Sequence, residues 1–488
     1  MSRWRALPSL PERVPARWVH AILLLLGVLL AARLIGLTWL MSVNVPFSDQ
    51  WAVLRSLEDG FQWSDVLTAF RWQHGPHRQG LSFAFMLPAY HFSHWSVRLD
   101  SLVMVVEQLV AGLLVLRLRR QLVPGPWSLW DAILLLVFWG VCTFETMTVA
   151  PNASHSIFPL LLLMLAANVW LWPLGLARLA VLSVLILGLT FTGFGITAIP
   201  AIVVVLLLQV WRADGAGRWQ AMFLLAASAV SMGLFLQDYH FVVAADGFEA
   251  MQPNPLDYLH FMVAMFSHFT LMLHRAPRWL LYPVGALVLG ALVIGALRSL
   301  KALTAPGTGV DADADAQAPG DRRLFEICLI LIGCSLAFAL LTAYGRVQLG
   351  VAAATASRYT ALMMPGVAAV VLLLMRFRQR MAPVLLVVLL LFTVRLVPET
   401  RQAWLQSRYY ASMKLCWLEN YRPSRDFDAA SERVKALDGF KTFQEVWMGE
   451  PGTWQMLAEQ ASGPFAAGGD DSPFLKVYPH PCEVLQAP

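Results

Sequence analysis

The sequence predicts an all-α membrane protein with about eleven membrane-spanning helices. Hydrophobic residue types make up 58% of the chain and charged types only 14%, whereas a soluble protein carries about a quarter charged residues. Apolar runs of about 18 residues recur along the chain, which is the length a helix needs to cross a bilayer. The mean hydropathy of +0.60 agrees with this fold class.

Each predicted span is an apolar run bounded by polar residues. In chain order the spans are 19–42, 97–116, 128–147, 157–174, 178–191, 196–211, 219–236, 279–297, 324–343, 359–375 and 381–397. The first follows an arginine-rich start without a small-residue cleavage signal, so we expect a retained helix. The fifth and sixth are short and flank Gly193 and Gly195, and a hairpin that does not fully cross is an alternative for this pair.

Arginine and lysine residues gather at alternate connections between the spans, and the positive-inside rule places these connections in the cytoplasm. The other connections then lie outside, at 43–96, 148–156, 192–195, 237–278, 344–358 and from 398 onward. This predicts a multi-pass protein of the bacterial cytoplasmic membrane, with a cytoplasmic N-terminus and a periplasmic C-terminal region. The formal charge of +5 reflects this topology and does not indicate nucleic acid as a partner.

The segments outside the spans divide the chain into a transmembrane domain, 1–397, and a small outer region, 398–488. Residues 304–320 are low in complexity and predict a flexible cytoplasmic linker. Residues 79–95 and 256–275 mix apolar residues with histidines and aromatics, which predicts helices lying in the outer membrane interface. Cys416 and Cys482 both fall in the outer region, where an oxidising compartment permits a disulfide, although the sequence leaves the pairing open.

The first outer loop, 43–96, begins with NVPFSDQW, which holds Asp49 just beyond the first span. A carboxylate in a partly desolvated interface is suited to act as a general base or to bind a divalent cation. The alternatives are a helix cap or a solvated loop residue.

The same loop contains QHGPHRQG, with His74, His77 and Arg78 close together. Gly75 and Pro76 make a regular helix improbable there, so the two histidines do not form a helical metal pair. We expect them and Arg78 to form hydrogen bonds or to contact a phosphate. Anchoring in the interface is the alternative.

A second polar cluster lies in YGRVQLGVAAATASRYT, which carries Arg346, Arg358 and Tyr359 between two spans. An arginine near lipid is costly unless it is paired or hydrated, and a phosphate matches the guanidinium fork. The alternative is that these side chains extend to the lipid headgroups.

Weaker signals come from Glu145 at the outer end of the third span, from His155 just outside it, and from Asp238 at the outer end of the seventh. These residues lie on the same side as the first loop and the two arginines. Their shared sidedness predicts one outer cavity lined by acids and arginines.

The arrangement of a first outer loop with an acidic residue just after the first helix resembles that of the membrane glycosyltransferases of the GT-C fold. These enzymes use polyprenyl-phosphate-linked sugars. The stretches QHGPHRQG and GRVQLGVAAATASRY also resemble bacterial membrane proteins grouped near that fold. Those proteins usually read His-Asn-Glu-His-Arg in the first stretch, whereas this chain has Gly75 and Pro76 in place of Asn-Glu. The positions that match are therefore His74, His77 and Arg78.

The resemblance implies transfer of a sugar from a polyprenyl-phosphate carrier to a glycan, lipid or protein acceptor on the outer face. Asp49 takes the place of the first-loop acid, as base or as contact for a divalent cation. Arg346 and Arg358 would bind the lipid phosphate, and the outer region would help to recognise the acceptor.

Two other classes of protein remain. A transporter, flippase or polymerase of envelope polysaccharide should carry ionisable groups in mid-membrane, and the predicted spans carry few. A non-catalytic membrane protein would use its tail to bind a partner, and the tail tryptophans fit that role as well as sugar stacking. The sequence contains no glycine-rich nucleotide loop and no complete zinc motif.

Overall fold

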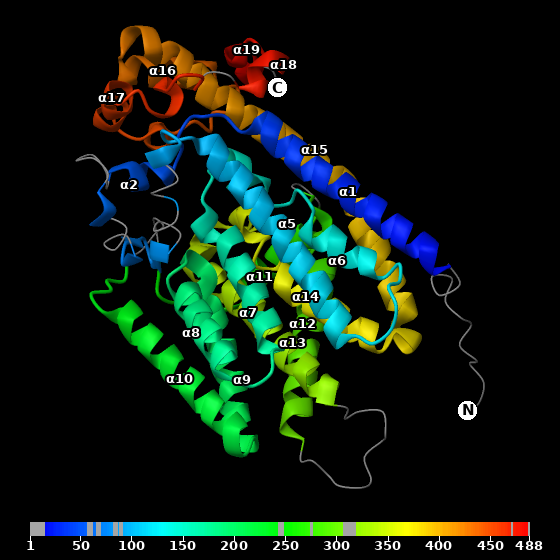
Figure 1. Cartoon of the computed structure of the whole chain (residues 1–488). Helices are drawn as coiled ribbons and strands as arrows, with labels where there is room; N and C mark the ends of the chain where they lie inside the picture. Colours follow the sequence, from blue (N-terminus) through cyan, green and yellow to red (C-terminus); the bar gives the residue numbers. More distant parts are fainter. Residues whose placement is uncertain are drawn as a thin grey trace.

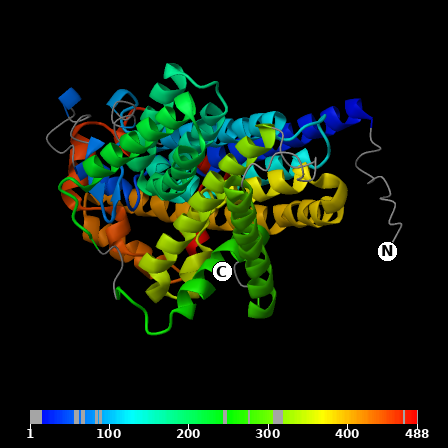
Figure 2. The same cartoon turned by 90° about the horizontal axis from the view of Figure 1, so that it is seen from below.

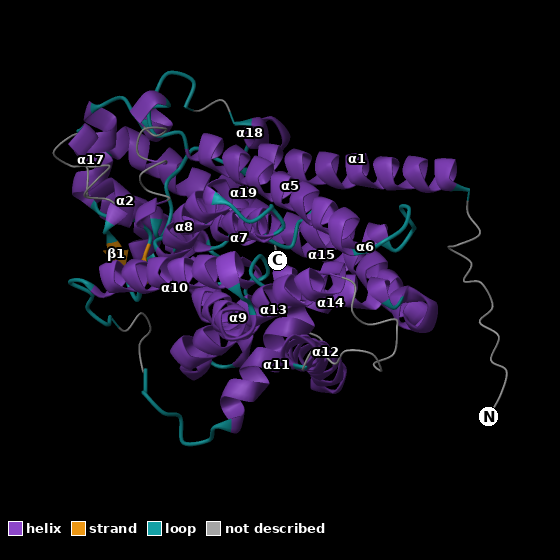
Figure 3. Cartoon of the chain, turned by 60° about the horizontal axis from the view of Figure 1, so that its bottom comes forward, coloured by secondary structure: helices purple, strands orange, loops and turns teal. Residues whose placement is uncertain are grey.

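The computed structural model describes residues 15–55, 62–64, 70–81, 86, 91–242, 248–273, 277–305, 319–469 and 472–486. Most of this part of the chain is helical. Its strands are β1 (Gln73–His74) and β2 (His77–Arg78), which form one antiparallel hairpin (Figure 3).

Seven helical segments of the described chain are long and apolar enough to cross a membrane. They are α1 (Ala16–Met41), α5 (Val97–Leu122), η4 with α9 (Gly193–Ala198 and Ile199–Arg212), α10 (Gly215–Leu236), α12 (Arg278–Thr304), α13 (Pro319–Arg346) and α15 (Arg378–Ser424). The shorter apolar helices are α7 (Ile157–Trp170), α8 (Leu176–Thr190) and α14 (Met364–Arg376). The predicted helical membrane architecture is therefore present, with fewer long spans than the sequence suggested.

The predicted span 128–147 is not a continuous helix. Only α6 (Asp131–Phe138) is α-helical, and a π-helix, η2 (Glu145–Val149), follows after several turns. The α-helix ends early because the Gln108 side chain of α5 donates to the carbonyl oxygens of Phe138 at 2.7 Å and of Gly140 at 3.0 Å. These bonds satisfy acceptors that a longer helix would have used internally.

The expected boundary at residue 398 lies inside a helix, because α15 runs unbroken through Pro398 to Ser424. A proline removes one helical hydrogen bond, and beside Pro398 the side chains of Arg395 and Glu399 are buried. The helix therefore connects the membrane part directly to the tail. In Figure 1 its far end carries the orange and red tail helices, and α1 lies beside it.

The segment predicted to lie flat in the interface at 256–275 is a packed helix instead. After an exposed first turn, α11 (Leu256–Leu271) buries nearly every side chain from Phe261 to Thr270. It packs against α12, α13 and α15. The apolar residues on several sides of this helix are the reason that it enters the bundle. Residues 82–85 and 87–90 of the other predicted interfacial segment, 79–95, and the linker residues 306–318 lie outside the described residues.

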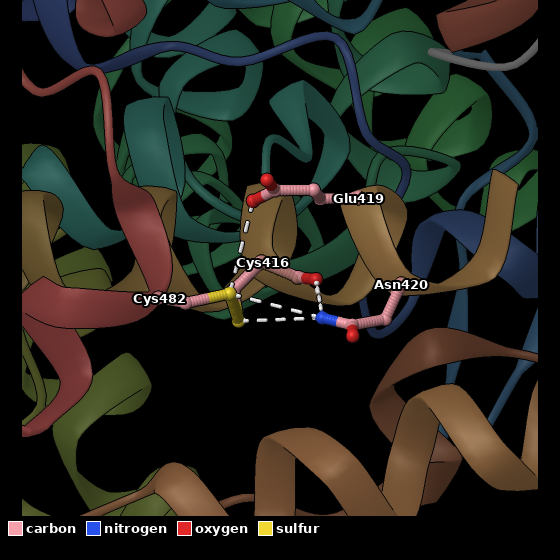
Figure 4. Close-up of a disulfide and its surroundings, with 4 residues drawn as sticks. All are labelled: Cys416, Glu419, Asn420 and Cys482. Carbon is pink, nitrogen blue, oxygen red and sulfur yellow. Dashed lines mark hydrogen bonds between the residues drawn. A yellow bond between two sulfur atoms is a disulfide. The ribbon is translucent and has the colours of Figure 1, made fainter. Parts of the chain in front are cut away.

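The tail wraps around the end of α15 with α16 (Phe427–Leu437), α17 (Pro451–Glu459), α18 (Pro473–Val477) and α19 (Pro481–Gln486). Cys416 of α15 and Cys482 of α19 form a disulfide with an S–S distance of 2.02 Å (Figure 4). Figure 2 shows the orange tail helices on the side of the molecule away from the N-terminus.

The tail packs within itself and against the first loop. Trp454 lies 4.6 Å from Trp417 of α15 and 4.9 Å from Trp51 of the short helix α2 (Gln50–Arg55), measured between ring centroids. The buried tryptophans thus join the tail to the first loop. We call this end of the molecule the Asp49 end.

The remaining short elements connect the helices at several points. They are η3 (Ala153–His155), η5 (Val347–Leu349), η6 (Val351–Thr355), η7 (Ser357–Tyr359), η8 (Glu445–Met448) and η9 (Gly463–Phe465).

Candidate functional site

The loop that carries Asp49 is held by the tail. Ser48 has a left-handed backbone, with φ of 56°, and its amide donates to the carbonyl oxygen of Trp447 at 2.8 Å. The indole of Trp51 donates to the same oxygen at 3.0 Å. The Phe47 ring also lies 5.6 Å from the Trp447 ring. These contacts fix the backbone on both sides of Asp49, whose side chain remains 40% exposed.

The hairpin presents its two histidines on one face. Gly75 opens the turn with φ of 57°, and His74 pairs with His77 across the strands. Because strand side chains alternate in direction, the neighbouring pair, Gln73 and Arg78, points to the opposite face. This alternation separates His77 from Arg78, although the two are adjacent in sequence.

Two imidazoles meet the carboxylate of Asp49. His74 Nε2 lies 3.6 Å from one carboxylate oxygen, and His155 Nδ1 of η3 lies 3.6 Å from the other. The second ring nitrogen of His155 lies 2.5 Å from the amide nitrogen of Gln79. A proton on His155 Nδ1 satisfies both contacts, because Nε2 can then accept from the Gln79 amide. The His74 ring stacks on Trp72 with centroids 5.3 Å apart.

The charge states follow from burial and from the surrounding groups. Desolvation opposes ionisation of Asp49, but the polar contact from His74 and the electrostatic influence of His155 and Arg358 outweigh it and hold its pKa below the usual range. Desolvation lowers the pKa of His155 to about 4. Desolvation, followed by the positive charges of His155 and Arg346, lowers the pKa of His77 to about 3. At neutral pH the site therefore combines an anionic Asp49 with neutral imidazoles at these two positions.

A second charged pair borders the acid. Arg358 Nη1 of η7 lies 2.7 Å from a carboxylate oxygen of Glu145, the first residue of the π-helix. The Glu145 amide donates to the Ser357 hydroxyl at 3.1 Å, and the Arg358 amide donates back to the Glu145 carboxylate at 3.3 Å. Two contacts with Glu145 thus hold the arginine, while its side chain stays 43% exposed. Tyr359 is buried beside it, with its ring 5.4 Å from the guanidinium.

Arg346 ends α13 and is close enough to influence His77 and His155 electrostatically. Among the described residues it has no ion-pair partner. Its positive charge is therefore available to an anion near the two histidines.

Two of the predicted site residues lie elsewhere. The guanidinium of Arg78 donates to the carbonyl oxygens of Phe235, at 2.7 Å, and Gln237 at the C-terminal end of α10, and to that of Arg71 before the hairpin. Asp238 follows that helix and acts electrostatically on Arg78. Both residues belong to the opposite face of the hairpin, away from the Asp49 carboxylate.

Several contributors to the site carried no distinct sequence signal. Trp447 lies about four hundred residues from Asp49 in sequence and acts through its backbone carbonyl. Phe194, whose ring centroid is 4.2 Å from that of His77, lies in the short predicted connection 192–195 and carries no polar group that would mark a site. Gln79 is a single polar residue whose role depends on His155.

A metal centre is not evident in the described part of the chain, where no group of three or more His, Cys, Asp or Glu side chains is arranged to hold an ion. Asp49 with His74 and His155 comes nearest, but both imidazole nitrogens face the carboxylate itself. This geometry fits an electrostatic contact of the two rings with the carboxylate better than shared coordination of a cation.

The fold and the site define a helical membrane protein with a polar cluster of acid, imidazole and guanidinium groups at one end of its apolar helices. No family model, curated protein or solved structure matches the chain.

Proposed function

We propose that the chain is a membrane glycosyltransferase that moves a sugar from a polyprenyl-phosphate carrier to an envelope acceptor on the periplasmic face. The observation that carries the proposal is the convergence at the Asp49 end of Asp49, His74 and His155 with the Arg358–Glu145 pair. They come from separate segments of the chain. A site at the ends of apolar helices suits a donor whose lipid stays in the bilayer and whose phosphate lies at the interface.

The low pKa of Asp49 favours an orienting role for this carboxylate over proton abstraction, since an effective base has a pKa near the working pH. An Asp49 carboxylate that accepts from His74 Nε2–H leaves Nδ1 of that imidazole as the proton acceptor. We therefore propose His74 as the general base and Asp49 as the group that fixes its tautomer and stabilises the imidazolium.

The proposed step is a displacement of the carrier phosphate by an acceptor hydroxyl at the anomeric carbon. His74 takes the proton of an acceptor hydroxyl, whose oxygen forms a bond to the anomeric carbon as the bond from that carbon to the phosphate oxygen breaks. The phosphate leaves with the electron pair. Arg346 and the remaining N–H groups of Arg358 are positioned to stabilise its charge, because guanidinium matches phosphate oxygens.

Two observations support a periplasmic Asp49 end. Arginine-rich connections gather at the other ends of the helices, as expected for the cytoplasm. The disulfide between Cys416 and Cys482 is on the tail beside the Asp49 loop, and disulfides persist in oxidising compartments.

The experiment compares envelope glycans by mass spectrometry in a deletion strain complemented with wild type, Asp49→Asn or Asp257→Asn. Asp257 is a matched control, because it is a half-exposed acid that contacts a histidine, His260, at 3.9 Å on α11. We expect wild type and Asp257→Asn to restore a missing sugar and Asp49→Asn to fail at equal membrane abundance. Unchanged glycans in the deletion strain, or full activity of Asp49→Asn, would refute the proposal.

Transport is the second candidate, because the membrane helices hold more charge than the sequence suggested. Arg33 of α1 lies 3.2 Å from Glu399 of α15, which also contacts Arg395 at 3.4 Å. Glu399 and Arg395 are almost fully buried. Ionisable groups inside a membrane bundle often mark a transport path. Lipid-linked glycan that accumulates on the cytoplasmic side of the deletion strain would favour this function over transfer.

A further inference from the structure

A cavity of about 400 Å³ lies on the face of the hairpin that carries Gln73 and Arg78. Its walls come from two segments far apart in the sequence. The hairpin segment contributes Arg71, Gln73 and Arg78, and the chain beyond α10 contributes Gln237, Asp238 and His240. The histidine face of the same hairpin belongs to the site around Asp49, so the hairpin separates the two sites.

Hydrogen bonds hold the walls of this cavity together. The buried guanidinium of Arg78 bridges Phe235, Gln237 and Arg71 through their carbonyl oxygens, which satisfies acceptors at the end of α10. The Tyr239 hydroxyl donates to the carbonyl oxygen of Pro76 at 2.9 Å, at the tip of the hairpin. The cavity is therefore built by the chain before any ligand enters it.

Two charged side chains on its rim are open to a ligand. Arg71 is exposed and, among the described residues, forms one hydrogen bond, from Nη2 to the Gln237 side chain at 3.0 Å. Asp238 is exposed, and no donor in the described chain contacts its carboxylate within hydrogen-bond distance. Its backbone is left-handed, with φ of 54°. Such a conformation costs free energy in a residue other than glycine and is found disproportionately at ligand sites.

We propose that this cavity binds an anionic saccharide headgroup, with Arg71 on the carboxylate or phosphate group and Asp238 on the sugar hydroxyls. A guanidinium fork matches the paired oxygens of such an anion, and an ionised carboxylate can only accept hydrogen bonds, which sugar hydroxyls can donate. Gln73, Gln237 and His240 supply further polar groups around the sugar. The net positive charge of the two arginines against one acid favours an anionic ligand over a neutral one.

The assignment rests on the proposed function in one respect, because it makes this headgroup part of the acceptor. Gly75 lines the cavity, and the next residue before it is His74, the proposed base. An acceptor held in the cavity can therefore reach around the hairpin turn to His74 with a neighbouring sugar unit.

The test titrates purified full-length protein in lipid nanodiscs with glucuronate, glucose 6-phosphate, glucose and inorganic phosphate, and measures binding by ligand-observed NMR. We expect the two anionic sugars to bind. Arg71→Gln should lower their affinity by about tenfold, which corresponds to about 1.4 kcal/mol in binding free energy. Asp238→Asn should weaken the binding of glucuronate, glucose 6-phosphate and glucose to a similar extent. Arg218→Gln is the control, since Arg218 is an exposed arginine near the opposite end of α10.

The outcomes divide clearly. Anionic-sugar binding that depends on Arg71 supports the site, and the preference between glucuronate and glucose 6-phosphate identifies the anion. Equal affinity for inorganic phosphate and glucose 6-phosphate, or binding that survives both Arg71→Gln and Asp238→Asn, overturns the proposal. Asp49→Asn should leave this binding intact. A failure of the glycan experiment with binding retained therefore refutes the transferase alone, and lost binding with normal glycan transfer refutes the cavity assignment alone.

Discussion

Replacing Gly449 by alanine should loosen the contact between the tail and the Asp49 loop. Gly449 follows η8 with φ of 82°, in the left-handed region, where a Cβ atom costs about 1–2 kcal/mol. A Cβ built on this glycine would lie 2.4 Å from the Trp51 ring, which forces the indole to move. Overpacking of this kind costs about 1–3 kcal/mol. Together these terms predict a loss of about 2–5 kcal/mol in the free energy of unfolding.

Gly452 provides a matched control three residues further along. It lies in the first turn of α17, and a Cβ built there meets no heavy atom within 4 Å. Gly452→Ala should be neutral or stabilising by up to about 1 kcal/mol, because alanine favours a helix over glycine. The assay is thermal unfolding of each purified variant followed by tryptophan fluorescence, together with glycan complementation. Equal melting temperatures for the two variants would refute the packing argument.

Three further predictions concern the tail and the charged groups. Replacing Cys416 and Cys482 by serine opens a loop of 66 residues and should cost about 4 kcal/mol, measured by thermal unfolding with and without reductant, and an unchanged melting temperature would contradict this estimate. The pKa of His77 is lowered from 6.5 to about 3, so the unfolded chain binds a proton there first; the stabilisation is present above pH 6.5 and is lost as the pH falls towards 3. His77→Gln should therefore flatten the decline of melting temperature between pH 7 and pH 4, and an unaltered profile would exclude this imidazole as the cause. Arg358→Lys should retain the ion pair with Glu145 but lose the guanidinium fork, so polyprenyl phosphate binding by native mass spectrometry should fall between wild type and Arg358→Ala, whereas lysine equal to arginine would argue against a forked phosphate contact.

The sequence could predict that the site residues lie on one side of the helices, but not which residues belong to the site. Charge at the helix ends assigned Asp49, His155 and Arg358 to one side, and the structure brings them together. The same reasoning also included Arg78, which faces away. His77 and Arg78 are adjacent in one strand, so their side chains point to opposite faces. Which of the two faces lies against Asp49 depends on how the hairpin packs on the rest of the chain.

The helix boundaries failed for a similar physical reason. Apolar runs show where a helix is favourable in lipid, but not where a neighbour will satisfy its carbonyl oxygens. Gln108 stops α6 at Phe138 by supplying donors from another helix. Pro398 suggested the end of a span, yet α15 continues through it, and Glu399 directly after it is buried against other helices. Neither partner is visible in a local window of sequence.

The tail is part of the site because it contacts both the loop that carries Asp49 and the π-helix that begins with Glu145. Trp447 supplies the carbonyl oxygen that fixes the loop of Asp49. Lys414 of α15 is fully buried and donates to the carbonyl oxygens of Thr148 at 3.1 Å and Val149 at 2.9 Å, at the end of the π-helix that begins with Glu145. Without these donors, the last carbonyls of that helix would lie buried and unpaired, at a cost of about 1–3 kcal/mol each. A tail that served only to bind a partner would have no reason to bury a lysine beneath the site, so its packing favours a role in positioning Asp49 against Arg358.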